Sequence, residues 1–450
     1  MTKTKKEKLV LFLQIMLPIL ITQIGMFSMT FFDTVMTGNF SAEDLAGVGI
    51  GSSIWTPVYT GLGGILVAIT PIVSQQIGGG NKKDVPFTIT QGSYLSIIMA
   101  VLIFGIGYFS LNPILDTMNL EPKVHEVAHD YLAALSTGII PLFLYSALRY
   151  FIDALGQTRI SMFITLLALP INVLFNYMLI YGKFGFPALG GVGAGYATSI
   201  TYWVILAIAI FVIMKVHPFR EYNVFRKMIP YSFKENLTIL KIGVPIGLSI
   251  FFETSIFSAV TLLMSKYDTI TIASHQTAMN FSSFLYMMPL SISMALTIVV
   301  GYEVGAKRYK DAKQYAGIGT ILAVSFAGLF AVFLYFFRTD VAWLYSKDAE
   351  VIHLTANFLV LALFFQFSDA VMAPIQGALR GYKDVNVTFV LSFASFWLVG
   401  LPVGYIFSEY TGMGPYGYWF GLIAGLALGA VSLACRLLYI QRKVQARSSE

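Results

Sequence analysis

The feature that most constrains this chain is a succession of long, uninterrupted apolar runs. Twelve of them follow one another, at roughly residues 9–37, 47–77, 87–115, 125–150, 160–181, 191–215, 235–264, 272–304, 314–337, 350–379, 386–407 and 416–438. A helix of about 20 apolar residues crosses the hydrocarbon core of a bilayer. Because the runs are continuous and do not alternate with a period of two, they predict transmembrane helices and exclude a porin-type barrel.

The composition supports this interpretation. Apolar residues make up 57% of the 450 positions and charged residues only 12%, whereas a soluble domain carries about 25% charged residues. We therefore predict an all-α polytopic membrane protein with the lipid bilayer as a partner. The single cysteine, Cys435, excludes an intrachain disulfide and a cysteine-based metal cluster.

The basic residues predict the orientation in the membrane. With the N-terminus placed inside, all lysines and arginines but five fall at the inner side, the five being Lys123, Lys183, Lys266, Arg338 and Lys347. The positive-inside rule then predicts a multi-pass protein of the cell membrane with both termini in the cytoplasm. The net charge of +6 is explained by this topology, and no nucleic-acid partner is expected.

A second pattern is an internal repeat at an offset of 227 residues. Residues 15–19 align with 242–246, and residues 68–84 align with 295–311, where six of seventeen pairs are identical. Six runs separate the copies, so both halves enter the membrane from the same side. We predict two six-helix lobes, residues 1–214 and 235–450, related by a pseudo-two-fold axis along the membrane normal. Residues 215–234, here called the basic linker, are predicted to join them in the cytoplasm.

Three acids lie deep in apolar runs: Asp33 in the first, Glu253 in the seventh and Asp369 in the tenth. An ionised carboxylate at the membrane centre costs roughly 2.5–3.5 kcal/mol, so such a group usually faces an internal cavity and has a function. No lysine or arginine is expected deep enough in the runs to neutralise them. Protonation or a bound cation would relieve the cost, so the three acids are predicted to bind coupling cations. Permanent interhelical hydrogen bonds are the structural alternative.

Other polar residues accompany the first acid. Asn172 and Asn176 are four residues apart and share a helix face, and Thr198 adds a hydroxyl in the following run. Their oxygens suit Na⁺ beside a carboxylate, and they serve equally well for hydrogen bonds between helices. Pro18, in the middle of the first run, is predicted to kink that helix, either as a moving element or as a static bend.

A motif of soluble enzymes, H-E-x-x-H, occurs at His125–His129. On a helix it would present two imidazoles to Zn²⁺. It lies at the outer end of the fourth run, where polar residues are ordinary, and no third ligand is evident; His275 would have to reach it from the other lobe. A membrane-embedded metalloprotease is therefore kept only as an alternative, and no enzyme activity is predicted. No Walker loop is present, so we expect an ion gradient to drive transport.

A cleft between two lobes could bind a variety of flat apolar cations. The chain contains 37 Phe and 18 Met, and such side chains repack around ligands of different shape. Ser53 and Gln276, at similar depth in the two halves, are the predicted polar contacts of this substrate cleft.

Together these features resemble the MATE family of multidrug exporters, in its NorM-type branch. The resemblance covers the whole chain: its length, the twelve runs, the duplicated lobes, the segment Phe32–Gly38 and the two acids of the second half. It implies that an organic cation leaves while Na⁺ or H⁺ enters, as the lobes rock. It also implies cation-coupling sites at Glu253 and Asp369, the Na⁺ candidates, and at Asp33, Asn172, Asn176 and Thr198. Phe365, one turn before Asp369, is included in the predicted cation-coupling site of the second half, although this branch is expected to have a tyrosine there.

The sequence therefore predicts a monomeric, cofactor-free antiporter that exports lipophilic organic cations in exchange for Na⁺, with H⁺ as the alternative ion. A lipid-linked precursor flippase shares the duplicated design and is the other transporter considered. It would need lysines or arginines in the cleft to receive an anionic headgroup. A scaffold without transport is a further alternative.

Overall fold

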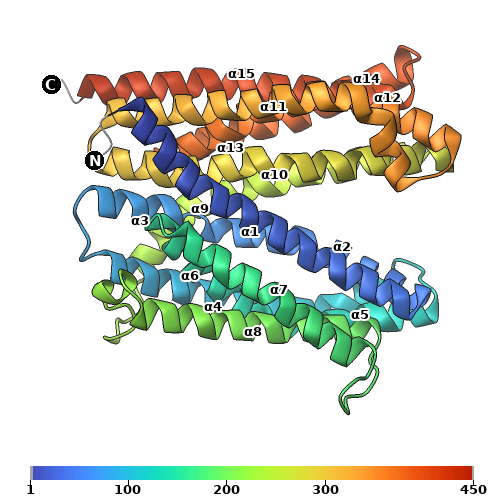
Figure 1. Cartoon of the computed structure of the whole chain (residues 1–450), viewed down its shortest axis with the longest axis horizontal. Helices are drawn as coiled ribbons and strands as arrows, with labels where there is room; N and C mark the ends of the chain where they lie inside the picture. Colours follow the sequence, from blue (N-terminus) through green and yellow to red (C-terminus); the bar gives the residue numbers. More distant parts are fainter. Residues whose placement is uncertain (1–3, 448–450) are drawn as a thin grey trace. The chain divides into compact units, whose positions relative to one another are not determined.

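The computed structural model describes residues 4–447, so the first three and last three residues of the predicted lobes lie outside the described chain (Figure 1). Every regular element within this range is helical. The elements, in order, are α1 (Lys5–Phe40), α2 (Ala42–Leu66), α3 (Ile69–Gly78), α4 (Val85–Asp116), α5 (Pro122–Ser136), α6 (Ile139–Ala154), α7 (Thr158–Ile180), α8 (Gly191–Lys215), η1 (Phe219–Tyr222), α9 (Phe233–Met264), α10 (Thr269–Gly305), α11 (Tyr309–Tyr345), α12 (Ala349–Gly381), α13 (Val385–Phe393), η2 (Ala394–Gly400), α14 (Leu401–Tyr410) and α15 (Pro415–Arg447).

The helices are long enough to make a multi-pass membrane protein. Eleven helical segments within the described residues can cross a bilayer by length and composition, and α5 with α6 forms a further pair bent by 51°. The predicted all-α membrane fold is confirmed, with 11 or 12 candidate spans. The fourth predicted run, 125–150, is not one straight helix. At its break, Gly138 packs so closely against α8 that an added Cβ would lie 2.7 Å from the Cα of Ser199.

Several helices begin at a capping residue. The Ser41 hydroxyl accepts a hydrogen bond from the Asp44 amide at 3.0 Å at the start of α2. The Asp268 carboxylate accepts one from the Thr271 amide at 3.1 Å at the start of α10, and Asp348 does the same for α12. These side chains satisfy backbone N–H groups that have no partner in the first turn of a helix.

The contacts divide the chain into two compact units. One, here called the N-unit, is Pro18–Gly247; the other, the C-unit, is Met1–Leu17 together with Leu248–Glu450. The boundaries fall inside α1 and inside α9, so each of these helices belongs partly to both units. Pro18 is the first residue of the N-unit, and α1 continues through it as one helix, with the Thr22 hydroxyl donating to the Pro18 carbonyl at 2.9 Å. The division into lobes at the basic linker stays a prediction.

A buried lysine attaches the first turns of α1 to the C-unit. The Lys8 ammonium donates to the Asp311 carboxylate and to the Gln314 amide oxygen, both on α11, and lies over the Tyr315 ring at 5.9 Å from its centroid. The Lys8 side chain is 3% exposed, whereas that of Asp311 is 30% exposed. Loss of the Asp311 carboxylate would therefore leave the Lys8 ammonium as a buried charge without a counter-charge. Loss of the Lys8 ammonium would leave the Asp311 carboxylate, which water reaches.

We expect Asp311→Asn to lower stability more than Lys8→Met. The first change leaves a buried cation without a counter-charge and should cost about 3 kcal/mol, and the second should cost about 1 kcal/mol because Asp311 is partly solvated. Thermal unfolding of the purified protein in detergent measures the order. The double variant should unfold at a higher temperature than Asp311→Asn alone, and the exposed Lys6→Gln should change nothing. Equal effects of the two single changes would contradict this asymmetry.

Within the C-unit, α10 and α12 pack closely through small residues. A Cβ added at Gly377 would overlap the Ser293 backbone, and the Thr297 hydroxyl donates to the carbonyls of Ser293 at 3.0 Å and Gly377 at 3.1 Å. Small residues and hydroxyls of this kind let helices approach each other in a membrane. This packing fixes α12, which carries Asp369.

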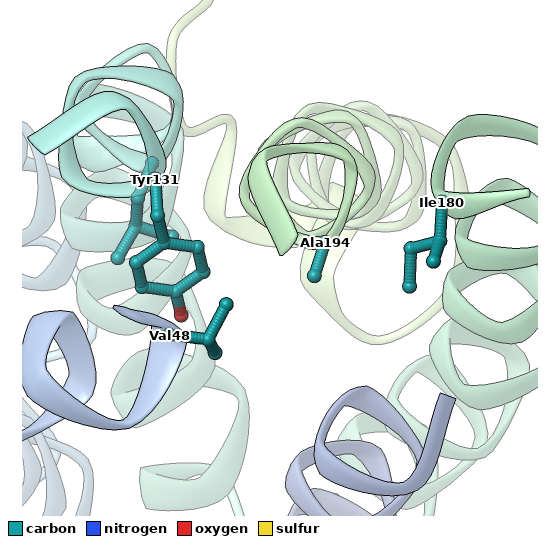
Figure 2. Close-up of a cluster of buried hydrophobic side chains, with 5 residues drawn as sticks. Val48, Tyr131, Ile180 and Ala194 are labelled. Atoms are coloured by element: carbon teal, nitrogen blue, oxygen red, sulfur yellow. The ribbon is translucent and has the colours of Figure 1, made fainter. Parts of the chain in front are cut away.

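Within the N-unit, an apolar cluster joins four helices. It contains Val48 of α2, Tyr131 and Leu135 of α5, Ile180 of α7 and Ala194 of α8, and Figure 2 shows the Tyr131 ring beside Val48, with Ala194 and Ile180 projecting from the two neighbouring helices. The Tyr131 hydroxyl lies 3.4 Å from that of Ser52. The cluster fixes the arrangement of α7 and α8. Both helices carry residues that were predicted to accompany Asp33.

Candidate functional site

The first site gathers around Asp33 in the N-unit. Asn176 donates from Nδ2 to the Asp33 carboxylate at 2.5 Å, and the Thr198 hydroxyl donates to its other oxygen at 3.3 Å. Asn172 donates to Thr198 at 3.4 Å and accepts from Asn176 at 3.2 Å. The structure thus brings the four residues together from α1, α7 and α8, and we call them the Asp33 cluster.

The Asp33 cluster offers oxygen atoms to a cation. The Asn176 side-chain oxygen is buried and has no hydrogen-bond partner among the described residues. Asp33 makes no ion pair with any lysine or arginine of residues 4–447. Tyr131 and Tyr202 are close enough to interact electrostatically with its charge. A carboxylate and a free amide oxygen are ligands that a hard cation accepts.

The second site gathers around Glu253 in the C-unit. Gln376 of α12 donates to the Glu253 carboxylate of α9, and its Nε2 lies 3.3 Å from the Ser392 hydroxyl of α13. Asp369, which is buried on α12, lies close enough to Glu253 for the two charges to repel each other. Tyr286 of α10 interacts electrostatically with both acids. We call these five residues the Glu253 cluster.

A buried arginine lies beside the second site, which corrects one expectation. No lysine or arginine was expected deep enough to neutralise the acids, but Arg380 is buried on α12 and its charge attracts that of Glu253. In the N-unit, Arg149 is also buried, and its Nε lies 3.6 Å from the carboxylate of Asp153, another buried acid. Glu253, Asp369 and Arg380 together carry one net negative charge when both acids are ionised.

The remaining predicted residues lie around these sites. Phe365 is buried and packs its ring against Phe257 and Trp419, with centroid distances of 5.6 and 6.4 Å. Ser53 is exposed, and its hydroxyl donates to the Gly49 carbonyl at 2.8 Å. Gln276 is exposed on α10. Ser53 belongs to the N-unit and Gln276 to the C-unit, and their role in a substrate cleft stays a prediction.

Comparison with protein families accounts for the repeated architecture. A model of the MatE family matches residues 18–178 and 245–406. The chain belongs to the MatE family. The two matched segments begin 227 residues apart, which is the offset of the internal repeat found in the sequence.

Relatives of this MatE-family chain match it over almost its whole length. A protein of Halalkalibacterium halodurans, named probable multidrug resistance protein NorM, is 56% identical over 444 residues, which cover 99% of this chain and 97% of that protein. A Bacillus subtilis protein of the same name is 55% identical over 442 residues, which cover 98% of each. The predicted NorM-type resemblance is therefore confirmed.

Solved structures of MATE transporters share the fold. The bent form of the Vibrio cholerae MATE transporter VcmN superposes with a TM-score of 0.89 at 19% identity, covering 98% of this chain and 99% of that one. An outward-facing multidrug resistance MATE family transporter of the MOP superfamily gives 0.87 at 19% identity, covering 99% and 97%. At this identity the likeness concerns the fold alone.

Each histidine of the H-E-x-x-H segment lies beside an aspartate in this MatE-family chain. Nε2 of His125 lies 3.0 Å from Asp116, and Nδ1 of His129 lies 2.9 Å from Asp130. His275, in the C-unit, accepts from the Trp419 indole at 3.1 Å and contacts the Thr261 hydroxyl at 3.0 Å. No group of three or more His, Cys, Asp or Glu in the described residues could hold a metal ion.

Three residues of the Glu253 cluster and the neighbouring Arg380 were not predicted from the sequence; the three are Gln376, Tyr286 and Ser392. Gln376 and Arg380 follow Asp369 by seven and eleven residues, a spacing that keeps all three on one face of α12. That spacing was available in the sequence as a signal. Tyr286 and Ser392 offered none, because hydroxyl residues are frequent in these helices and only the packing of α10 and α13 against α12 selects these two.

Proposed function

We propose that the chain is a multidrug exporter, not an enzyme, which moves lipophilic organic cations out of the cell in exchange for Na⁺. The observation that carries this proposal is the Glu253 cluster, in which Glu253 and Asp369 lie close enough for their charges to repel each other, while the charge of the buried Arg380 attracts that of Glu253. The remaining negative charge, inside apolar helices, requires a cation to balance it. The name shared by the NorM relatives, multidrug resistance protein, supports organic molecules as the cargo.

Competition for this charge explains how the two fluxes are coupled. An organic cation binds while Glu253 and Asp369 are ionised, and Na⁺ arriving from outside neutralises the same carboxylates and releases it. The site cannot bind the organic cation and Na⁺ together with the affinity that it has for each alone, because only one net negative charge is available. Coupling of transport then follows from the different affinities of the two ligands for the outward-open and inward-open states.

The two helices shared between the units support alternating access. Asp33 lies on α1 and Glu253 on α9, the helices that cross from one unit to the other. A cation that binds either acid therefore changes the hydrogen bonds or charges that hold a shared helix. We propose that these helices transmit the occupancy of the acids to the conformation of the protein, which works as a monomer with both termini in the cytoplasm.

We prefer Na⁺ to H⁺ because of the free oxygen in the Asp33 cluster. A proton would need only the carboxylate, whereas Na⁺ also takes amide and hydroxyl oxygens, and the buried Asn176 oxygen has no hydrogen-bond partner in the described chain. The flippase alternative gains little from the buried arginines. Arg149 pairs with Asp153, and the charge of Arg380 attracts that of Glu253, so neither offers an unbalanced positive charge to an anionic headgroup.

Reconstituted vesicles test both the cargo and the ion. We expect an inward Na⁺ gradient at equal pH to drive export of ethidium, and the same gradient of K⁺ to drive none. A pH gradient without Na⁺ that drives export equally well would assign the coupling to H⁺ instead. Dye movement that no gradient accelerates above protein-free vesicles would contradict antiport.

A further inference from the structure

The basic linker is held firmly on the N-unit. Gln91, buried on α4, donates to the Pro230 carbonyl at 2.8 Å and accepts from the Ser232 amide at 2.8 Å. The Asn236 amide donates to the same Gln91 oxygen at 2.9 Å, and the Tyr94 hydroxyl donates to the Ile229 carbonyl at 2.9 Å. Both polar groups of the Gln91 side chain are thus engaged, and they fix the path of the chain from the linker into α9.

Buried aromatic packing fixes the earlier part of the linker. Phe219 is fully buried, and its ring lies 6.0 Å from that of Phe151 on α6, with Tyr222 at 5.9 Å from the same ring. The linker is therefore attached on both sides of residues 225–228. These contacts on both sides determine which side chains of residues 225–228 are exposed.

The exposed face of the linker combines unpaired cations with apolar side chains. Its five cations make no ion pair with any residue of the described chain; they are Lys215, Arg220, Arg226, Lys227 and Lys234. Its one acid, Glu221, pairs with His217 at 2.7 Å. Beside these cations, Met228 is fully exposed and Phe233 is 72% exposed, with Phe225 and Tyr231 also exposed.

This combination is characteristic of segments that bind the surface of a charged membrane. Cations attract anionic headgroups, and neighbouring apolar side chains enter the boundary between headgroups and acyl chains. The linker also lies where such a surface is, because it directly joins α8 and α9, which are both candidate membrane spans. A connection that served only as a topological signal would need the charge but not the exposed Met228 and Phe233.

We propose that the basic linker is a binding site for anionic phospholipid. Arg226, Lys227 and Lys234 contact the lipid phosphates, and Met228 and Phe233 insert at the interface. Because Phe233 is the first residue of α9, bound lipid contacts the same helix that carries Glu253. This inference depends on the linker alone and does not require the proposed exchange of ions and drugs.

A fluorescent probe on the linker tests the proposal. The full-length protein with Met228→Cys and Cys435→Ser carries one thiol, at the centre of the site, for an environment-sensitive dye. Titration of phosphatidylglycerol into its micelles should give a saturable rise in fluorescence. Phosphatidylcholine and inorganic phosphate should give none, which separates a lipid site from a phosphate site.

Charge removal on the linker should weaken this response strongly. Each cation near an anionic surface contributes roughly a fivefold factor, so Arg226→Gln, Lys227→Gln and Lys234→Gln together should raise the half-saturating fraction of phosphatidylglycerol about 100-fold. Phe233→Ser, with all cations kept, should raise it about tenfold. Salt at high concentration should weaken the response of the unaltered linker, because it screens charges at a surface.

A matched variant separates a specific site from net charge. Lys307, Lys310 and Lys313, around the start of α11, are exposed, and no large exposed apolar side chain lies between Tyr302 and Ile321. Their joint replacement by glutamine removes the same charge and should shift the half-saturating fraction less than about threefold. The proposal is overturned if both triple variants shift it equally, or if phosphatidylglycerol leaves the fluorescence unchanged.

Discussion

Glu253→Gln and Asp369→Asn should each reduce drug export to background. Either change removes one of two negative charges, and Arg380 then balances the other, so that no net charge remains to attract a cation. Loss of one partner from a buried charged group costs about 2–5 kcal/mol, which corresponds to at least roughly 30-fold in affinity. Ethidium efflux from cells that lack their own exporters measures the effect, with immunoblots of the membrane fraction to show that the variants insert.

A matched acid on the same helix serves as the control. Glu350 is exposed in the first turn of α12, and Glu350→Gln makes the same chemical change without altering the charge of the Glu253 cluster. It should leave efflux unchanged. Normal efflux from Glu253→Gln or Asp369→Asn would remove these acids from the mechanism.

Asp33→Asn should uncouple transport without preventing drug binding. The substitution removes the only charge of the Asp33 cluster and places an amide where Asn176 and Thr198 both donate hydrogen bonds. A buried donor that loses its acceptor costs about 1–3 kcal/mol, in addition to the lost attraction for a cation. We expect Na⁺-driven dye transport in vesicles to fall at least about 30-fold. Dye binding should remain within about twofold, because the Glu253 cluster is unchanged.

Binding and transport must be measured on the same preparation to separate these roles. Fluorescence anisotropy of the dye reports binding in detergent, and the vesicle assay reports coupling. Asp130→Asn is the matched control in the N-unit, because Asp130 lies at the helix surface beside His129. If Asp33→Asn abolished binding together with transport, or left both intact, a separate coupling role for Asp33 would be wrong.

The class of protein could be predicted because it depends on local composition. The length and continuity of the apolar runs indicate helices that cross a membrane, whatever their neighbours are. The Asp33 cluster could be anticipated in part for a similar reason, since the four-residue spacing of Asn172 and Asn176 places both on one face. Their cation-coupling role remains a prediction.

What the sequence could not provide depends on contacts between distant segments. Arg380 ends a long apolar run, and no local pattern indicates that its side chain is buried where its charge attracts that of Glu253. At the bend between α5 and α6, Gly138 packs closely against Ser199, and no local pattern connects these two residues. The division of α1 and of α9 between the two units likewise leaves no trace in the hydropathy of the sequence, because a helix is equally apolar in either unit.

The sharing of α1 between the two units has a consequence for biosynthesis. Its opening turns are made first, yet the Asp311 that binds Lys8 follows 303 residues later. At roughly 5–20 residues per second, a ribosome needs about 15–60 seconds to reach it. During that interval the beginning of the polypeptide has no site to occupy, whereas the N-unit is complete once Gly247 has been synthesised. A gene cut within the basic linker would therefore encode two fragments that each lack a piece of their own unit, and only joint expression would restore both.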